Sequence, residues 1–275
     1  MSAPAAPPPA AARGRFVDLV LWGGLALLLA LSAGPVELNR FPLLFSNSAR
    51  MGEFLSGFTQ PDFSSLWPRR DGGRLEWGGS YLGEMWETVQ MALWGTALAV
   101  VAAVPLSLLC ARNIAPAPVV WITRRLMDIL RSVNELVIGI LFVASVGLGP
   151  FAGVLALALH TTGVLAKLFS EAVEAVDPRP VEGVRATGAS PVEEVVWGVL
   201  PQVAPLWTSY ALYRFEANSR SASVLGLIGA GGVGQLLFDA LNSFAYSQVS
   251  AIVIVIIVAV SAIDFLSQLI RKRLL

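Results

Sequence analysis

The chain has 275 residues, of which 55% are hydrophobic and only 14% are charged, and its formal net charge at pH 7 is zero. Soluble domains carry about 25% charged residues, so this much apolar surface indicates a lipid bilayer as solvent rather than one water-soluble core. The absence of a basic stripe excludes a nucleic-acid partner. With a single cysteine, Cys110, and a single histidine, His160, the chain cannot form an internal disulfide framework, and we expect no metal site.

The first 87 residues divide into three predicted segments. Residues 1–15 begin with a Pro/Ala-rich stretch and predict a disordered cytoplasmic tail. The apolar run 16–34 predicts a first transmembrane helix; a signal peptide is the alternative, but no clean small-x-small cleavage site follows. Residues 35–87 are rich in Pro, Gly, Trp and charges, so we expect a periplasmic loop with room for short helices.

Residues 88–275 form the predicted core domain. Apolar stretches predict helices over about 88–110, 127–147, 151–170, 202–228 and 248–270, with a tight turn at Gly147–Pro150. Arginines and lysines in the short loops and at both ends all fit one side of the membrane. The prediction is an all-α integral membrane protein with about six transmembrane helices and cytoplasmic N- and C-termini.

The loop at about 171–201 has the start and stop signals of two short helices. Asp177 before Pro178 suits a helix start, and Gly188 can end that helix in a left-handed conformation. Ser190 and Glu193 have the spacing of a capping box, which predicts a second start. The next membrane helix is expected to begin at Pro201.

The sequence contains no phosphate-binding loop for a nucleotide. The chain has two lysines, Lys167 and Lys272, and neither follows a glycine, so a G-x-x-x-x-G-K-[ST] sequence is absent. If ATP drives this protein, another polypeptide must bind it.

The spacing of the 182–201 loop resembles the EAA loop of ABC importer permeases. Glu182, Gly188, Leu200 and Pro201 match that motif, while Gly198 replaces its isoleucine. Gly183 and Val184 replace its two alanines. The resemblance implies a type I ABC importer permease fold. It also implies a role in coupling to the ATPase for six residues: Glu182, Gly183, Val184, Gly188, Leu200 and Pro201.

Four further segments, within about 85–273, strongly resemble the phosphonate-type permeases of the PhnE family. They are 131–135 (RSVNE), 146–178, 213–218 (YRFEAN) and 229–234 (GAGGVG). This resemblance implies a multi-pass protein of the bacterial inner membrane that carries phosphonate-like oxyanions, with phosphite or hypophosphite as the alternative cargo. The implied partners are a second copy of the chain, an ATPase dimer holding ATP and Mg²⁺, a periplasmic phosphonate- or phosphite-binding protein and membrane lipid. The chain itself would hold no cofactor and catalyse no reaction.

Polar side chains inside predicted membrane helices are costly and usually face a cavity or a partner. The candidates for the translocation pathway are Asn134, Glu135, His160, Thr161, Thr162, Arg214, Glu216, Asn218 and Arg220. Purely structural roles are the alternative: a capped helix end with an Arg131–Glu135 ion pair, hydrogen bonds made by the threonines within or between helices, and a buried pair of Glu216 with Arg220.

The glycine-rich segment near residue 230 is the candidate outer gate, where bare backbone permits close packing and bending. Its glycines are Gly229, Gly231, Gly232 and Gly234, and a simple flexible turn is the alternative.

Two rival classes fit the sequence less well. A secondary transporter usually shows internal repeats, and none is visible here. An intramembrane hydrolase or metalloenzyme would need a G-x-S-x-G or H-E-x-x-H sequence, which the chain lacks.

Overall fold

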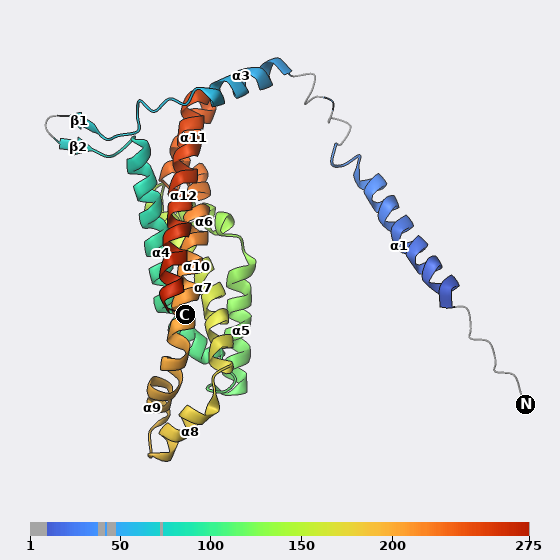
Figure 1. The fold of residues 1–275 in the computed structure, drawn as a ribbon, viewed down its shortest axis with the longest axis vertical. Coiled ribbons are helices and arrows are strands. Elements are labelled where there is room, and N and C mark those ends of the chain that lie inside the picture. Colours follow the sequence, from blue (N-terminus) through green and yellow to red (C-terminus); the bar gives the residue numbers. More distant parts are fainter. Residues whose placement is uncertain (1–9, 38–41, 43–47, 72–73, 275) are drawn as a thin grey trace, which may run out of the picture. The chain divides into compact units, whose positions relative to one another are not determined.

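The computed structural model describes residues 10–37, 42, 48–71 and 74–274 (Figure 1). The chain divides into two compact units, residues 1–56 and 57–275, which are described separately. The first unit contains α1 (Ala10–Ser32) and most of α3 (Ser48–Thr59). Helix α3 is one of the short helices for which the 35–87 segment has room.

Helix α1 begins earlier than the sequence predicts. Residues 10–15 were expected in the disordered tail but are helical, and the run of three alanines at 10–12 explains this because alanine is the best helix former. The rest of the predicted tail, residues 1–9, lies outside the described residues. Within α1, the described residues Asp18–Ser32 form an apolar helix.

The described part of the second unit is helical apart from a short hairpin, in which β1 (Arg69–Asp71) pairs antiparallel with β2 (Arg74–Glu76). Its helices are α4 (Tyr81–Cys110), α5 (Ala117–Ser132), α6 (Glu135–Val146), α7 (Pro150–Glu174), α8 (Pro178–Ala186), α9 (Pro191–Glu193), the π-helix η2 (Glu194–Val199), α10 (Leu200–Leu225), the 3₁₀-helix η3 (Gly226–Ile228), α11 (Val233–Asn242) and α12 (Tyr246–Leu274). Helices α8 and α9 lie at one end of this unit and the hairpin at the other (Figure 1).

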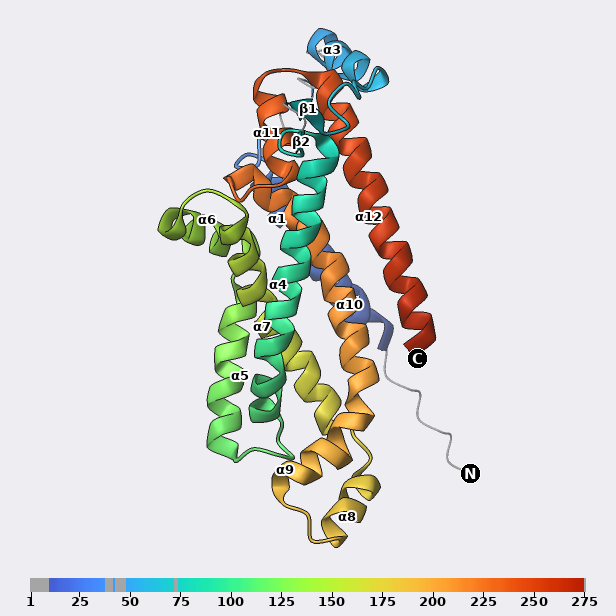
Figure 2. The same cartoon turned by 90° about the vertical axis from the view of Figure 1, so that its left-hand side faces the viewer.

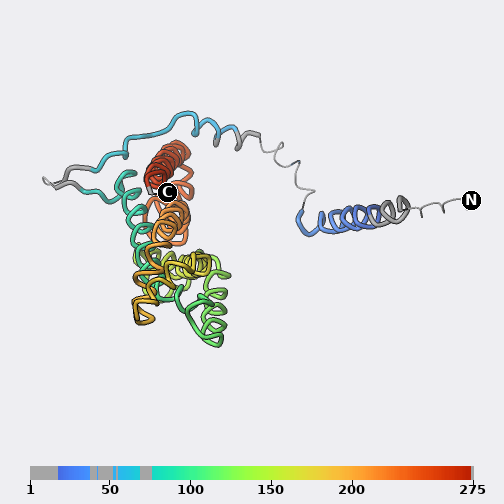
Figure 3. Tube along the Cα trace, turned by 60° about the horizontal axis from the view of Figure 1, so that its bottom comes forward, coloured from blue at the N-terminus to red at the C-terminus, as the bar shows by residue number. Residues whose placement is uncertain are grey.

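Helices α4, α7 and α10 form the centre of the bundle (Figure 2). One face of α4 carries the buried small residues Ala92, Gly95, Ala99 and Ala103. A Cβ on Gly95 would lie 2.8 Å from the Cβ of Leu157 on α7, so the two backbones approach too closely for a larger residue. Small residues drive this kind of packing in membranes. Helix α12 packs beside α10, as the red and orange tubes of Figure 3 show.

The predicted single helix over 127–147 is wrong. Helix α5 ends at Ser132, α6 begins at Glu135, and the two are bent by 85° (Figure 2). The break arises because Val133 is extended and Asn134 caps α6, its side-chain oxygen accepting the N–H of Leu136 at 2.8 Å. The capped helix end weighed as an alternative for Asn134 and Glu135 is present, and the predicted turn before Pro150 is confirmed.

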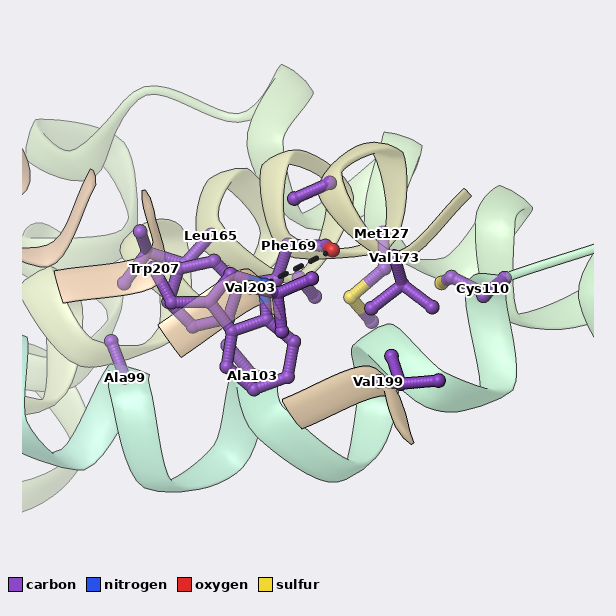
Figure 4. Close-up of a cluster of buried hydrophobic side chains, with 13 residues drawn as sticks. Ala99, Ala103, Cys110, Met127, Leu165, Phe169, Val173, Val199, Val203 and Trp207 are labelled. Carbon is purple, nitrogen blue, oxygen red and sulfur yellow. Dashed lines mark hydrogen bonds between the residues drawn. The ribbon is translucent and has the colours of Figure 1, made fainter. Parts of the chain in front are cut away.

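The core nearest α8 is organised by two aromatic rings (Figure 4). Phe169 on α7 and Trp207 on α10 stack with ring centroids 4.7 Å apart, and the Trp207 indole donates to the Phe169 carbonyl at 3.2 Å. Val199 and Val203, where η2 runs into α10, belong to the same buried cluster. The loop end of the molecule is therefore packed continuously onto the membrane helices.

Three helices among the described residues are long and apolar enough to cross a membrane: α4, α7 and α12. Two bent pairs, α5 with α6 and the 191–242 helices, pass the same test together and raise the number to five. With the shorter apolar helix Asp18–Ser32 as a further candidate, the structure agrees with a multi-span helical membrane protein.

Candidate functional site

The helix–turn–helix predicted for the 171–201 loop is present. Helix α8 begins after Asp177, whose carboxylate accepts the N–H of Arg179 at 3.0 Å. After α8, Gly188 has a φ of +85°, a conformation that glycine adopts without steric cost. The carboxylate of Glu193 accepts the N–H of Ser190 at 2.7 Å, which closes the predicted capping box. These local predictions are confirmed.

The second helix of the loop does not end before the membrane helix. Helix α9, the π-helix η2 and α10 follow one another without a break, although a new helix was expected to start at Pro201. A proline inside a helix removes one hydrogen bond and crowds the carbonyl four residues earlier. The wider π turn lies directly before Pro201, where that crowding would occur.

Helix α8 is fastened to η2 by an ion pair and a close backbone contact. The Arg185 guanidinium donates to both carboxylate oxygens of Glu194, at 2.9 and 2.8 Å. Gly198 is buried, and a Cβ there would lie 3.0 Å from the Cα of Val181. Gly198 departs from the EAA pattern at a point where α8 and η2 lie close together.

Gln202 makes a third connection, which the sequence did not reveal. Its amide nitrogen donates to the carbonyls of Gly198 at 2.7 Å and Asp177 at 3.2 Å. Its amide oxygen accepts the N–H of Asp177 at 3.1 Å. One side chain on α10 thus holds the start of α8 and the π-helix together.

Hydrogen bonds stabilise the ionised form of Glu193 and Glu194 in this loop. The Arg185 guanidinium holds the pKa of the Glu194 carboxyl below its usual value. The Ser190 N–H and hydroxyl do the same for the pKa of Glu193. Both carboxylates are therefore charged at neutral pH.

None of the residues of α8 is buried in the part of the chain that the structure describes, so this helix has an exposed outer surface. A hollow of about 640 Å³ on one side is lined by Glu182, Arg185 and Glu194 among others. A second hollow, of about 620 Å³, is lined by Gly183, Val184 and Gly188 among others, and by Trp197, which is 70% exposed. Leu200, in contrast, packs against the buried Phe169 cluster, and Pro201 lies in the first turn of α10. Four of the six candidate coupling residues thus lie in the exposed loop, and the other two, Leu200 and Pro201, lie at the start of α10.

Three candidate pathway positions take part in bonds between or within helices. The Thr161 hydroxyl on α7 donates to the Asn218 side-chain oxygen on α10 at 3.0 Å. The Asn218 amide donates in turn to the Thr96 hydroxyl on α4 at 2.9 Å, and all three residues are buried. Thr162 donates to the Ala158 carbonyl of its own helix. The structure therefore gives these residues the structural roles weighed as alternatives, and their contact with a substrate stays a prediction.

His160 contacts both Val133 and Glu135, at the break between α5 and α6. Its Nδ1 lies 3.0 Å from the carbonyl of Val133, and its Nε2 lies 3.7 Å from a carboxylate oxygen of Glu135. Glu135 also accepts the Ser221 hydroxyl of α10 at 2.7 Å. The expected Arg131–Glu135 ion pair is wrong, because the bend separates the two residues and Arg131 pairs with Asp128 at 2.8 Å.

Glu216 is the centre of a second network, which joins α10 to α12. The expected Glu216–Arg220 pair is confirmed at 3.2 Å, and Arg271 of α12 contacts the other Glu216 oxygen at 3.1 Å. Arg220 also reaches Asp264 at 3.2 Å. These four side chains hold the two helices together.

Among the candidates, Arg214 is the one whose side chain has no close polar partner in the part of the chain that the structure describes. Its Nη2 is 3.5 Å from the Asn218 oxygen, at the limit of a hydrogen bond, and its buried Nε has no partner among the described residues. Glu135 is near enough for a Coulomb attraction. An arginine within a candidate span and with unused donors is costly unless something outside this chain completes it.

The glycine-rich segment is hydrogen-bonded to α4 at the point where α11 begins. Glu87 accepts the N–H of Gly232 and Thr88 accepts the N–H of Val233, each at 2.9 Å. Gly232 has a φ of +71°, and a Cβ there would collide with the Thr88 hydroxyl, so only glycine fits. The Gly229 carbonyl accepts the N–H of Gly149 in the α6–α7 turn at 2.9 Å. Gly231 and Gly234 are buried in the same segment.

Similar solved structures identify the fold. A chain of the inward-facing MetNI methionine ABC transporter matches with a TM-score of 0.62 and 20% identity, covering 70% of this chain and 95% of that one. A chain of a bacterial ABC transporter involved in the import of the polysaccharide alginate matches with a TM-score of 0.56 and 12% identity, covering 92% and 98%. The fold is that of the type I ABC importer permeases.

Sequence comparison then identifies the family. Residues 103–275 match the family described as the binding-protein-dependent transport system inner membrane component, and the chain belongs to it. The phosphite transport system permease protein PtxC of Stutzerimonas stutzeri is 45% identical over 195 residues, which cover 70% of this chain and 71% of PtxC. PhnE2 of Escherichia coli (strain K12), named for a cryptic phosphonate transport system, is 60% identical over 119 residues, covering 43% and 98%. The phosphate-import permease protein PhnE of Mycolicibacterium smegmatis is 43% identical over 189 residues, covering 68% of this chain and 36% of that protein.

Proposed function

We propose that this permease conducts small phosphorus oxyanions, phosphonates first among them, through the membrane in an ATP-driven importer. The observation that carries the proposal is the 60% identity with a permease named for phosphonate transport. The relatives named for phosphite and phosphate transport support the same chemical class, a tetrahedral phosphorus centre with anionic oxygens. Phosphite and hypophosphite are the alternative cargoes.

The polar features of the bundle fit an anionic cargo. Arg214 offers guanidinium donors that the described part of the chain leaves unused, and arginine can bind a phosphorus oxyanion through two parallel hydrogen bonds. Asn134, Glu135, His160, Glu216 and Arg220 would then shape the surroundings of the pathway. The glycine segment 229–234, tied to Glu87 and Thr88, would be the outer gate.

The exposed loop would be the site of energy input. We infer that α8 docks on a separate ATPase subunit, which binds ATP and Mg²⁺, since the sequence has no phosphate-binding loop of its own. The connections at Arg185, Gly198 and Gln202 would pass the movement of α8 to α10 as one rigid body. The permease itself would catalyse no reaction.

The assembly follows from the same proposal. One chain supplies only half of a pathway, so two copies would pair, with an ATPase dimer on the cytoplasmic side and a binding protein on the periplasmic side. Both termini and the 171–201 loop would be cytoplasmic and residues 35–87 periplasmic, in the bacterial inner membrane. Residues 1–15, 16–34 and 88–275 would be the tail, the first span and the core domain.

Reconstitution tests the proposal directly. The permease is placed in proteoliposomes with its ATPase and binding protein, and uptake of labelled methylphosphonate, phosphite and phosphate is measured with and without ATP. We expect uptake that requires ATP and both partners, with methylphosphonate preferred. Uptake by the permease alone, driven by an ion gradient, would instead identify a secondary transporter.

A further inference from the structure

A basic pocket lies beside α5, separate from the exposed face of α8 and from the candidate pathway. It encloses about 510 Å³, within the range of small-molecule sites. Its charged lining consists of Arg112, Arg124, Arg125, Lys167 and Asp128. The neighbouring loop residue Asn113 lines one of the hollows beside α8, so the pocket is at the same end of the bundle as the coupling loop.

The pocket has more positive charge than its own carboxylates can neutralise. Arg124 is satisfied by Glu174 at 2.6 Å. Asp128 is shared among three cations, and its closest partner is Arg131, outside the pocket, at 2.8 Å.

Three basic side chains of the pocket still have N–H groups available to bind another anion. Arg125 and Lys167 reach Asp128 only at 3.5 and 3.8 Å. Arg112 makes no side-chain ion pair with any described residue, and its side chain is exposed. The pocket thus carries a net positive charge that an incoming anion would meet.

An exposed apolar surface continues from this pocket along α5. Trp121 lines the pocket and is 64% exposed, and Ile122 and Ile129 on the same helix are 62% and 61% exposed. A ligand that suits both parts has an anionic head and an apolar tail. Basic pockets between membrane helices characteristically hold phosphate headgroups, and tryptophan favours the headgroup level of a bilayer.

We propose that this pocket binds the phosphate headgroup of an anionic phospholipid, whose acyl chains lie along the exposed face of α5. The site differs from the cargo site in place and in ligand: it would hold lipid at the membrane surface and have no part in translocation. Free phosphate shares the headgroup's chemistry but cannot use the apolar face of α5.

Native mass spectrometry of the purified full-length protein tests this proposal. The protein is titrated with phosphatidylglycerol and, in parallel, with phosphatidylcholine of the same acyl chains. We expect one tightly retained phosphatidylglycerol per chain. Binding should be weaker by tenfold or more in the double variant Arg112→Gln/Lys167→Gln, since both removed charges would attract the anionic headgroup. The double variant Lys272→Gln/Arg273→Gln removes the same charge elsewhere and should retain the lipid.

Three results would overturn the proposal. Equal retention of phosphatidylcholine would show that headgroup charge is not recognised. Equal loss in the 272/273 variant would show a general field effect rather than a site. Displacement of the lipid by millimolar inorganic phosphate or methylphosphonate would assign the pocket to a free oxyanion. If the Arg112→Gln/Lys167→Gln variant elutes as aggregate, Arg125→Gln replaces it in the same titration.

Discussion

Val181 of α8 and Gly198 of η2 are in backbone contact, and a Cβ on Gly198 would lie 3.0 Å from the Val181 Cα. The EAA pattern has an isoleucine at this position. In this chain the missing side chain lets α8 rest directly on the π-helix, beside the Arg185–Glu194 pair. The contact has consequences for both stability and coupling.

Enlarging Gly198 should force α8 away from η2. We expect Gly198→Leu to lower the unfolding free energy by about 1–3 kcal/mol through overpacking and to reduce ATP-driven uptake. Thermal unfolding in detergent, followed by circular dichroism, measures the first effect. Gly183→Ala is the matched control, because a Cβ at Gly183 meets nothing within 4 Å. An unchanged melting temperature for Gly198→Leu would contradict the close contact.

Acid should weaken the Arg185–Glu194 pair. Because the folded-state pKa of Glu194 is below its ordinary value of 4.5, the pair's contribution to stability is fully present above that value. It is lost as the pH falls through the lower folded-state pKa. The wild type should therefore lose more of its melting temperature below about pH 4.5 than Arg185→Gln does. Parallel acid profiles of the two proteins would argue against the pair.

Glu182→Lys should weaken ATPase binding while leaving the fold intact, because Glu182 is exposed on α8 and lines a hollow beside it. The measurement is co-purification of the ATPase subunit with the tagged permease, alongside its melting temperature. Asp239→Lys, an equal charge change on α11, serves as control. Normal ATPase recovery and normal uptake with Glu182→Lys would count against the coupling role.

Two neighbouring threonines should respond differently to loss of the hydroxyl. Thr161→Val breaks an interhelical bond to Asn218, and such bonds contribute about 0.6–1.7 kcal/mol in membranes. Thr162→Val removes only a bond to its own helix, so its stability should stay close to that of the wild type. Unfolding in mixed detergent compares the two. If Thr162→Val keeps its stability but loses uptake, that hydroxyl belongs to the pathway.

Variants of Arg214 and Arg220 should distinguish a role in transport from a role in stability. Arg214→Gln should reduce oxyanion uptake several-fold with little change in melting temperature, because its Nε has no partner among the described residues and its Nη2 is 3.5 Å from the Asn218 oxygen. Arg220→Gln should mainly lower stability, since it leaves Glu216 and Asp264 with fewer partners. Loss of the dimer in Arg214→Gln, seen by size-exclusion chromatography, would instead assign Arg214 to the contact between two copies.

Local sequence signals predicted the helix starts of the 171–201 loop well. Caps such as Asp177 and Ser190 act on groups two or three residues away. The helix starts that they form can therefore be predicted from the local sequence alone. Apolar residues lie on both sides of the polar stretch 131–135, so one helix was predicted there, although Asn134 is a cap residue that marks the start of α6.

Long-range partners could not be predicted in this way. Asn218 meets Thr96, 122 residues earlier, and Glu135 meets Ser221, 86 residues later. No spacing rule reaches across such distances, because the helices between them decide which faces meet. Gln202 was missed for another reason: its three partners are backbone groups, which leave no trace in the pattern of side chains.

The support that His160 gives to Val133 has a practical consequence, because the chain has no other histidine. A protein labelled with ¹⁵N at its imidazole would give a spectrum from a single ring. Its two nitrogens face the bend on one side and Glu135 on the other. Each state of the transport cycle that opens or closes that bend would therefore be visible in one resonance pair, without any added probe.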